Sequence, residues 1–369
     1  MKEGRPVRAA LYVAPCVAAC LAAAPAECGS SESGEPLGPD TTTVAPPQTL
    51  YGDVTGTHLP AGLLNGLSMD AGVADLDADG DLDIVIANEF RPNILLLNDG
   101  AGRFSDGSSR LPAANRDSED VGIADFDGDG DLDIVVVSED DRVNELYFND
   151  GAGRFSDEGA RLPVEGTTNG VVVADLNGDG FPDILFANNG QDAVVINDGT
   201  GNFVDETAER LPRAADVTQD LELGDVDGDG DLDLLFANVA AFVAGADPRN
   251  RLLINDGSGF FADETSARLP SATVSSFDGD LVDIDGDGDL DIVTANADVD
   301  LSVGRIANSR YRAYLNNGGG VFTDASDEVF GAGAVGTGLD LEFADLDGDG
   351  RPDFYLASRG TADRLLLRR

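Results

Sequence analysis

The chain has 369 residues and a formal net charge of −47, from 70 acidic and 23 basic side chains. A chain of this length can bury a large hydrophobic core. An excess of acids this large argues against nucleic acids and anionic membranes as partners, because both are themselves negatively charged. Much of the charge is confined to six short segments, whose predicted ligand positions hold 23 aspartates.

Residues 1–28 have the layout of a secretory signal peptide. Lys2, Arg5 and Arg8 form a basic start, and an alanine-rich apolar run covers 9–24. This run is shorter than the ~20 apolar residues that a membrane-spanning helix needs. We therefore expect a secreted, periplasmic or outer-surface protein.

All three cysteines lie in this first region. Residues 17–20 read Val-Ala-Ala-Cys and resemble a bacterial lipobox, which predicts a lipid anchor on Cys20. Ordinary cleavage after Ala24 or Ala26 is the alternative. A linker rich in Ser, Gly, Pro and Thr follows at 29–48. The folded part is expected to cover 49–369, and without cysteines it cannot depend on disulfides.

Six copies of one nine-residue acidic pattern organise the rest of the chain. Each has an acid at its first, third, fifth and ninth positions and a glycine at its sixth, except that Asn177 takes the third position of the third copy. Alternating oxygen ligands in a tight loop suit Ca²⁺, which takes six to eight oxygens. We therefore predict about six structural calcium ions. Acidic turns without a metal are the alternative, but they would not require the same spacing and glycine in every copy.

Five ligands are assigned to each loop: the side chains at positions one, three, five and nine, and the backbone carbonyl at position seven. A ninth-position acid that binds through both oxygens would bring the number of contacts to six. The predicted ligand residues are Asp75, Asp77, Asp79, Asp81 and Asp83; Asp125, Asp127, Asp129, Asp131 and Asp133; Asp175, Asn177, Asp179, Phe181 and Asp183; Asp225, Asp227, Asp229, Asp231 and Asp233; Asp283, Asp285, Asp287, Asp289 and Asp291; and Asp345, Asp347, Asp349, Arg351 and Asp353.

An EF-hand loop begins in the same way, but it needs a bidentate Glu at position twelve and a helix on each side. Position twelve is Ile, Val, Phe or Leu in five copies and Thr294 in the other, and none of these can replace that Glu. The flanks are short apolar runs such as 84–87 and 134–137, which favour strands. Each loop is therefore predicted to join two strands of a hairpin.

The pattern recurs at intervals of 50, 50, 50, 58 and 62 residues, and each unit holds four short strand candidates. In the first unit these are 72–74, 84–87, 94–97 and 103–105. An Asn-Asp-Gly or Asn-Asn-Gly turn separates the third and fourth candidates in five units. Four strands in every unit predict an all-β fold, a single β-propeller of six four-stranded blades.

A phenylalanine follows each of these turns and is expected to pack between the sheets; the five are Phe104, Phe155, Phe203, Phe261 and Phe322. Arg-Leu-Pro then closes four of the units, and its arginines either pair with acids of a neighbouring blade or are solvated. Residues 51–60 resemble a fourth strand with its closing Leu-Pro, and 365–367 resemble a third strand. The two ends are therefore expected to complete one blade together and to close the ring.

These loops and turns resemble the FG-GAP/VCBS repeat family over about 49–369. The resemblance implies a calcium-loop β-propeller, like the integrin α-subunit head and many secreted bacterial proteins. Such propellers often have seven blades, which is the less favoured alternative here. The family does not select an activity, because its members include adhesins, lectins and polysaccharide lyases.

Two insertions, at 239–249 and 297–310, account for the two longer intervals and lie between second and third strands. That places them on the face opposite the calcium loops, where long loops could bind a protein or a glycan. Insertions without a role are the alternative. The candidate partner-binding residues are Phe242, Arg249, Arg251, Arg305, Arg310, Tyr311, Arg312 and Tyr314.

The folded part has one histidine, His58, and neither cysteine nor lysine, which leaves few groups for nucleophilic catalysis. We expect no catalytic residues and predict a monomeric interaction or adhesion module. A polysaccharide hydrolase with paired carboxylates, a lyase that uses Arg310, Tyr311 and Tyr314, and a lectin are the alternatives.

Overall fold

The computed structural model describes residues 55–63, 67–139, 142–239, 246–271, 275–296, 298–300, 305–307, 311–331, 338–344, 351–358 and 364–368. The chain separates into two units, Met1–Thr57 and His58–Arg369, and every described strand belongs to the second. The expected signal peptide and linker lie outside the described residues. Within the described ranges, no helix is long and apolar enough to cross a membrane.

Each repeat folds into antiparallel strands that are hydrogen-bonded in chain order. The first repeat contains β1 (Ser68–Ala74), β2 (Asp83–Arg91), β3 (Ile94–Asn98) and β4 (Phe104–Asp106). The second and third contain β5 (Arg116–Ala124), β6 (Asp133–Ser138), β7 (Glu145–Asn149), β8 (Phe155–Asp157), β9 (Thr168–Ala174), β10 (Asp183–Gly190), β11 (Ala193–Asn197) and β12 (Phe203–Asp205). The fourth contains β13 (Asp216–Gly224), β14 (Asp233–Asn238), β15 (Arg251–Asn255) and β16 (Phe261–Asp263).

The fifth repeat contains β17 (Ser276–Val282), β18 (Asp291–Asn296), β21 (Tyr311–Asn316) and β22 (Phe322–Asp324). The insertion between β18 and β21 holds a small hairpin, β19 (Asp298–Asp300) and β20 (Arg305–Ala307), which the sequence did not predict. The sixth repeat shows three strands, β23 (Gly338–Ala344), β24 (Asp353–Ser358) and β25 (Arg364–Leu366).

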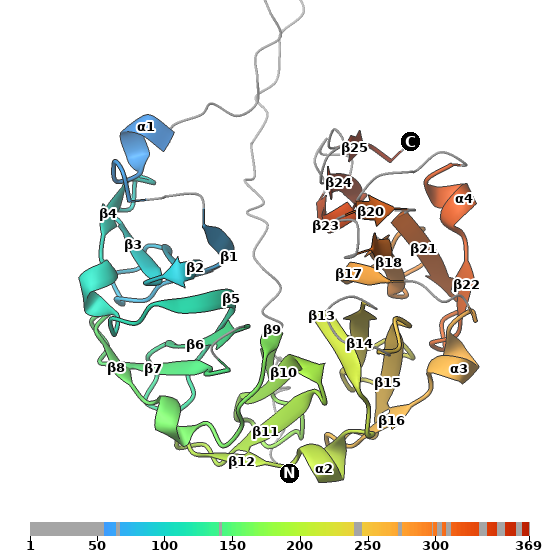
Figure 1. Cartoon of the computed structure of the whole chain (residues 1–369), viewed down its shortest axis with the longest axis horizontal. Coiled ribbons are helices and arrows are strands. Elements are labelled where there is room, and N and C mark those ends of the chain that lie inside the picture. Colours follow the sequence, from blue (N-terminus) through green and yellow to red (C-terminus); the bar gives the residue numbers. More distant parts are fainter. Residues whose placement is uncertain are drawn as a thin grey trace, which may run out of the picture. The chain divides into compact units, whose positions relative to one another are not determined.

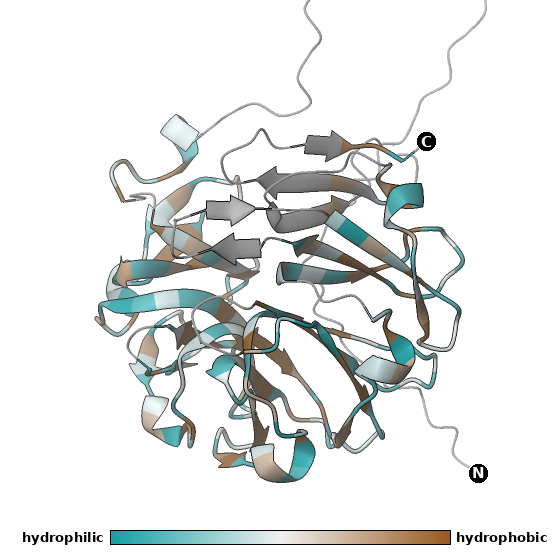
Figure 2. Ribbon diagram, turned by 45° about the vertical axis from the view of Figure 1, so that its right-hand side comes forward, coloured by the Kyte–Doolittle hydropathy of each residue, from teal (hydrophilic) through white to brown (hydrophobic). Residues whose placement is uncertain are grey.

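The second strands of several repeats are buried along their whole length, which explains their continuous apolar sequences. All six residues of β6 are buried, and the same holds for β14 and β18. Such a run, bounded by turns, is typical of a strand that is covered on both faces. Hydrophobic residues follow the strands, and hydrophilic residues gather at the loops and helical turns (Figure 2).

The first strands of successive repeats are neighbours: β1 contacts β5, and the series continues through β9, β13 and β17 to β23 (Figure 1). The repeats are therefore blades of an all-β propeller-like fold, as the sequence predicted. Five blades with four strands and a sixth with three lie in the described residues, and the count of six blades stays a prediction.

Two pairs of blades are also joined through their sheets. The long strand β2 pairs with β5, and β10 pairs with β13, so each pair of blades forms one curled eight-stranded sheet. The core runs between blades in the same way. Phe126 of the second blade meets Phe203 of the third edge-to-face, with their ring centroids 5.7 Å apart. Phe203, Phe261 and Phe322 are buried in these interfaces, which confirms their predicted role as packing residues.

A short helical turn follows the fourth strand of five blades: η1 (Ser108–Arg110), η2 (Gly159–Arg161), α2 (Thr207–Arg210), α3 (Thr265–Arg268) and α4 (Ser326–Val329). These turns were not predicted from the sequence. Residues 51–60 were expected to form a strand and its closing Leu-Pro, whereas Thr55–His58 forms the helical turn α1. Thr55–His58 precedes Leu-Pro just as Thr207–Arg210 does, so α1 follows the repeat. Residues 51–54, where the closing strand would lie, are outside the described residues.

The first strands approach so closely that a methyl group would not fit at one glycine. A Cβ added at Gly122 would lie 2.6 Å from Val173 Cγ2 and 2.7 Å from Val135 Cγ1, whereas one at Gly170 would have only contacts of 3.4 Å or more. We expect Gly122→Ala to lower the free energy of unfolding by ~1–3 kcal/mol through overpacking. Gly170→Ala should be neutral or slightly stabilising. Urea unfolding of the two variants measures the difference, and equal stabilities would contradict this packing.

Candidate metal centres

The acidic loops lie at one place in every blade, between its first and second strands. In the first blade the loop connects Ala74 of β1 to Asp83 of β2, which are partners in the antiparallel register. The prediction of a hairpin loop, and with it the exclusion of an EF-hand, is therefore confirmed for the described blades.

Carboxylates converge within these loops. In four of the described loops, three carboxylates each place an oxygen within 4.8 Å of the others. These groups are Asp75, Asp77 and Asp83; Asp125, Asp127 and Asp133; Asp225, Asp227 and Asp229; and Asp283, Asp285 and Asp291. Each group could hold a metal ion.

Backbone amides of the loop hold the carboxylates in place. In the second loop, Asp125 accepts hydrogen bonds from the amides of Gly128 and Gly130, at 2.8 and 3.0 Å. The amide two residues further along the chain donates to Asp127 and to Asp129. Gly130 has φ of 97°, a conformation that favours glycine, and this closes the turn. The loop sequence thus fixes the direction of its own acids.

The residue at position seven points away from the carboxylates. The carboxyl of Asp81 lies against Gly100 of the hairpin turn, and the Phe181 ring lies against Gly199 in the same way. An acid and a phenylalanine can therefore occupy the same position, because neither side chain faces the other acids. This arrangement fits a backbone ligand at position seven.

The third and sixth loops differ from the rest. In the third, Asn177 donates to Asp179 Oδ2 at 3.0 Å, and its own Oδ1 accepts from the Asp179 amide at 2.8 Å. The oxygen at position three is therefore kept with one charge fewer. In the sixth, the predicted ligands Asp345, Asp347 and Asp349 lie outside the described residues, while Arg351 precedes β24, which begins at Asp353.

The aspartate at position nine has a second role that the sequence analysis missed. Asp133 Oδ2 accepts from the amide of Phe126 at 3.0 Å, and its Oδ1 accepts from the amide of Asn149 at 2.9 Å. It therefore joins the acidic loop to the hairpin turn between the third and fourth strands. The same two bonds are made by Asp83, Asp183, Asp233 and Asp291.

These five aspartates are almost inaccessible to solvent. Burial raises the pKa of Asp133 and Asp183 to about 7 and that of Asp233 to about 6, because it disfavours the charged form, while the amide bonds act in the opposite direction. The pKa values of Asp83 and Asp291 are raised for the same reason. A cation beside these groups would favour their charged form.

Each loop is also bonded to the next blade through the first residue of the hairpin turn. The side-chain amide of Asn149 donates to the carbonyls of Leu132, in its own loop, and of Leu76, in the loop of the preceding blade, at 3.0 and 2.8 Å. Asn197, Asn255 and Asn316 make the corresponding pairs of bonds. Arg368 follows β25 at the equivalent place and donates to the Asp285 carbonyl of the fifth blade.

The arginines of Arg-Leu-Pro form a second connection. Arg110 donates to Asp77 of its own loop at 3.2 Å and to the Ala152 carbonyl of the next blade at 3.0 Å. Arg268 bonds to Asp227 and to the Gly319 carbonyl in the same way. The prediction that these arginines pair with acids of a neighbouring blade was therefore wrong. Their acids belong to the same blade, and they contact the neighbour through carbonyls.

A further acidic group lies outside the loops. Asp117 and Glu119 of β5 and Glu139 after β6 each place an oxygen within 4.8 Å of the other two. Its members are not spaced as in the loops, so the repeat pattern could not have revealed it.

The predicted partner-binding residues are only partly at the surface. Arg251 is buried and pairs with Asp216 at 3.0 Å and with Asp263 at 3.3 Å. Tyr311 is 1% exposed and packs against Phe330. Both residues begin third strands, and both are buried there, so the expectation that they contact a partner is not supported.

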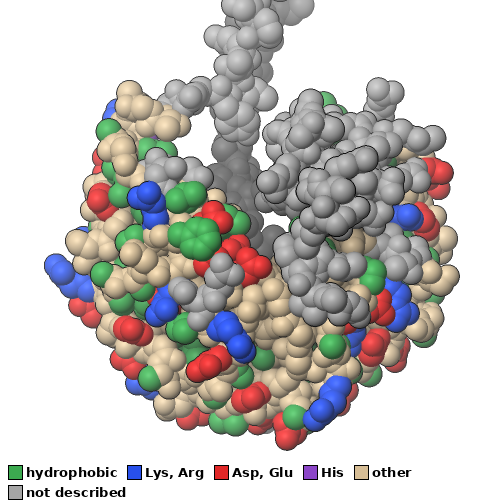
Figure 3. All heavy atoms as spheres, viewed as in Figure 1, with side chains coloured by type: hydrophobic (Ala, Val, Ile, Leu, Met, Phe, Trp, Pro, Cys, Tyr) green, Lys and Arg blue, Asp and Glu red, His purple; other side chains and the backbone are tan. Residues whose placement is uncertain are grey.

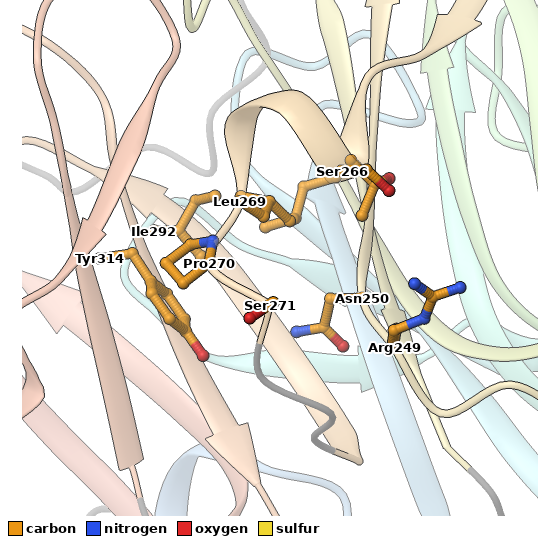
Figure 4. Close-up of a pocket in the computed structure, with 10 residues that line it drawn as sticks. Arg249, Asn250, Ser266, Leu269, Pro270, Ser271, Ile292 and Tyr314 are labelled. Atoms are coloured by element: carbon orange, nitrogen blue, oxygen red, sulfur yellow. The ribbon is translucent and has the colours of Figure 1, made fainter.

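Other members of that set are more accessible. Arg249 is exposed and pairs with Asp247, and Arg312 pairs with Asp324 at 3.0 Å. Arg305 belongs to β20, and Phe242 and Arg310 lie outside the described residues. Tyr314 is 6% exposed and lines a cavity of about 360 Å³ between the fourth and fifth blades, together with Arg249 (Figure 4).

Comparison with protein families agrees with this geometry. A family model for FG-GAP-like repeats matches residues 75–136, 125–186, 175–236, 240–294 and 295–356. The chain belongs to the FG-GAP-like repeat family. Each match begins or ends near an acidic loop. A search of curated proteins found no significant match.

Three solved structures have a similar fold. A lectin of Agrocybe aegerita that recognises non-reducing terminal N-acetylglucosamine is 20% identical, with a TM-score of 0.45, over 74% of this chain and 70% of the lectin. The Vibrio cholerae biofilm matrix protein Bap1 is 17% identical, with a TM-score of 0.39, over 69% of this chain and 38% of that protein. A putative exo-β-1,3-galactanase from Bifidobacterium bifidum is 11% identical, with a TM-score of 0.38, over 71% and 91%. These similarities are too distant to indicate what this chain binds.

The bonds between loops and blades can be tested at one asparagine of an FG-GAP-like repeat. Asn197→Ala removes the bonds from the Asn197 amide to the carbonyls of Phe126, which is buried, and Pro182, which is half-buried. It also removes the bonds that Asn197 Oδ1 accepts from the amides of Gly199 and Gly201. We expect a loss of ~2–4 kcal/mol in the free energy of unfolding, because each orphaned group costs ~1–3 kcal/mol. Thr200→Ala, exposed in the same turn, should change stability by less than ~0.5 kcal/mol. Denaturant unfolding compares them, and similar values would contradict the role of Asn197.

The raised pKa values predict a dependence on pH. Because the folded protein holds protons on Asp133, Asp183 and Asp233 that the unfolded chain would release, these groups favour folding below about pH 4 and lose that contribution as pH rises through 6 to 7. The melting temperature of metal-free protein should therefore fall between pH 5 and 8. A bound divalent cation competes with these protons and should reduce the fall, releasing protons as it binds.

Thermal melts at several pH values, with and without chelator, measure this effect. Asp133→Asn is the control, because it removes one titrating group and should flatten the metal-free profile. Identical pH profiles with and without the cation would contradict the linkage.

Proposed function

We propose that this protein is a calcium-binding β-propeller, secreted or anchored at the cell surface, that acts as an interaction or adhesion module. The observation that carries the proposal is the convergence of carboxylates in loops that are bonded to the neighbouring blades. Bound ions would stabilise these loops and, through them, the contacts between blades.

The choice of calcium follows from the ligands. They are carboxylate, amide and carbonyl oxygens, and the part of the chain from residue 49 contains one histidine and no cysteine, so zinc is disfavoured. Magnesium demands near-ideal octahedral geometry and usually keeps several waters, whereas calcium accepts six to eight oxygens in irregular geometry. A loop with four side-chain oxygens and one carbonyl suits calcium better.

Charge gives a second argument. Acidic side chains are spread over the described surface in Figure 3, and the chain as a whole carries −47. Like charges held within 4.8 Å of one another repel, and each bound calcium would cancel two of them. The structural role is therefore the natural one for the ions.

The location rests on the first 28 residues. Their basic start and apolar run support secretion, and the lipobox-like sequence before Cys20 supports a lipid anchor. Calcium is abundant outside the cell, which agrees with sites that are structural and do not act as calcium sensors.

The partner face is proposed to be the one opposite the acidic loops, where the β14–β15 and β18–β21 connections lie. The properties of two residues argue against the lyase alternative. Tyr311 is buried, and burial raises the pKa of Tyr314 to about 12, which disfavours the phenolate that a base would need. A hydrolase or a lectin on the same scaffold stays an alternative.

Removal of calcium tests the proposal. A site at ten times its dissociation constant adds ~1.4 kcal/mol, so five or six sites add ~7–8 kcal/mol. We expect EGTA to lower the melting temperature by more than ~10 °C, since ~1 kcal/mol corresponds to ~2 °C in a chain of this size. Calorimetry with metal analysis of the same sample measures both quantities. Unchanged melting, or absence of bound calcium at millimolar concentration, would contradict a structural role.

A matched pair of variants separates loop chemistry from net charge. Asp225→Asn with Asp229→Asn should remove one bound ion, because it takes two carboxylates from one converging group. Glu165→Gln with Glu209→Gln, at two exposed positions outside the loops, removes the same number of charges and should leave the metal content unchanged.

A further inference from the structure

We propose that the cavity between the fourth and fifth blades binds one ring of a neutral sugar. This proposal rests on the proposed interaction function and names its ligand class. The cavity has a volume of about 360 Å³, which lies within the range of ~300–1,000 Å³ found for small-molecule sites. It is lined by Leu235, Arg249, Asn250, Ser271, Ile292 and Tyr314, among others (Figure 4).

The side chain at one register position distinguishes this interface from two others. In the second blade, Glu145 is buried and accepts a bond from Asn93 of the first blade at 3.0 Å, so it fills the corresponding place. In the fifth blade, Arg312 occupies the equivalent register position. Arg312 pairs with Thr294 as Glu145 pairs with Val136, and these two partners each lie three residues after the ninth position of their loop. Arg312 instead turns to Asp324 at 3.0 Å. Asn250, the counterpart of Asn93, donates to Ser276.

The interface between the third and fourth blades supports this comparison. There the equivalent residue is Arg251, which pairs with Asp216 and is buried. Two interfaces are thus filled by a charged side chain with a buried partner, and the interface between the fourth and fifth blades is not. Between the second and third blades the same register position holds the small, buried Ala193, so the residue at this position varies from blade to blade. The cavity lies at an interface that no charged side chain fills.

The lining combines an apolar floor with a polar rim. Leu235 and Ile292 are each 1% exposed and form the floor with the ring of Tyr314. Figure 4 shows the rings of Pro270 and Tyr314 on one side and Ser271, Asn250 and Arg249 along the lower edge. A sugar ring has an apolar C–H face and a rim of hydroxyls that both donate and accept hydrogen bonds. It matches this division better than a purely apolar ligand would.

Charge selects a neutral sugar. Arg249 is the one cation among the described residues of the lining, and it is already paired with Asp247, its Nη2 lying 2.6 Å from Oδ2 and its Nε 3.1 Å from Oδ1. Uronate or sulfated sugars would have to displace Asp247 and approach a chain of net charge −47. A cationic ligand would find no carboxylate among the lining residues that the structure describes. Paired Arg249 still offers an N–H donor to a hydroxyl.

Titration of the calcium-loaded full chain with galactose, glucose, mannose, N-acetylglucosamine and glucuronate tests the proposal, with saturation-transfer NMR as the readout. We expect saturable binding of at least one neutral sugar. Ser271→Trp should weaken it at least tenfold by filling the cavity. Tyr314→Phe should weaken it a few-fold with packing kept. Ala113→Trp places a tryptophan at the corresponding position after the Leu-Pro of the first blade and should leave sugar binding unchanged.

Absence of binding by every neutral sugar, preference for glucuronate, or full binding by folded Ser271→Trp would overturn the proposal. The melting temperature and metal content of each sample are measured in parallel. A protein that binds calcium but no sugar rejects this proposal alone. One that binds sugar but no calcium rejects the structural role of the ions alone.

Discussion

The fold depends most on the buried aspartate at the ninth position of each acidic loop. Asp133 binds one amide of its own loop and one of the hairpin turn, so a single carboxylate fixes the geometry of two loops. It achieves this in a place where burial raises its pKa to about 7 and so disfavours its charge. The fold therefore depends on a carboxylate whose charged form is disfavoured by burial, and a nearby cation would favour that charged form. Ion binding and hairpin geometry are linked through this one group.

From this group the same chemistry extends to the next blade. Asn149 follows the turn that Asp133 holds, and its amide reaches the Leu76 carbonyl in the preceding loop. Arg110 crosses the same boundary from the other side, joining Asp77 to the Ala152 carbonyl. A blade interface thus combines an apolar interior with polar bonds that start at the acidic loops. An ion in one loop would act on two blades, since the bonds that order the loop also order its neighbour.

The repeat pattern predicted what is strictly periodic. Spacing and composition sufficed for the loops, the four strands of the first blade and the packing of Phe203, because each recurs with the same local chemistry. They did not predict the pairing of β2 with β5, which depends on contacts between distant segments. They also placed Arg251 and Tyr311 at the surface, since both sit beside long insertions. Their burial comes from their position in a third strand, where Arg251 pairs with Asp216 and Tyr311 packs against Phe330 whatever the length of the preceding loop. The helical turns Thr55–His58 and Thr207–Arg210 were both missed, because four residues are too few to show a helical periodicity.

Residues that depart from the repeat are the ones whose role is most readily assigned to function, because the architecture does not require them. Asn177 keeps an oxygen where the other described loops have an acid, so it preserves the loop and changes only its charge. Arg312 differs more, because it pairs with Asp324, whereas Glu145 at the same register position of the second blade is buried and accepts a bond from Asn93. The surrounding strands are unchanged, since the register of β18 with β21 matches that of β6 with β7. The cavity therefore lies beside strands of unchanged register, and it and the acidic loops involve different residues of the same strands.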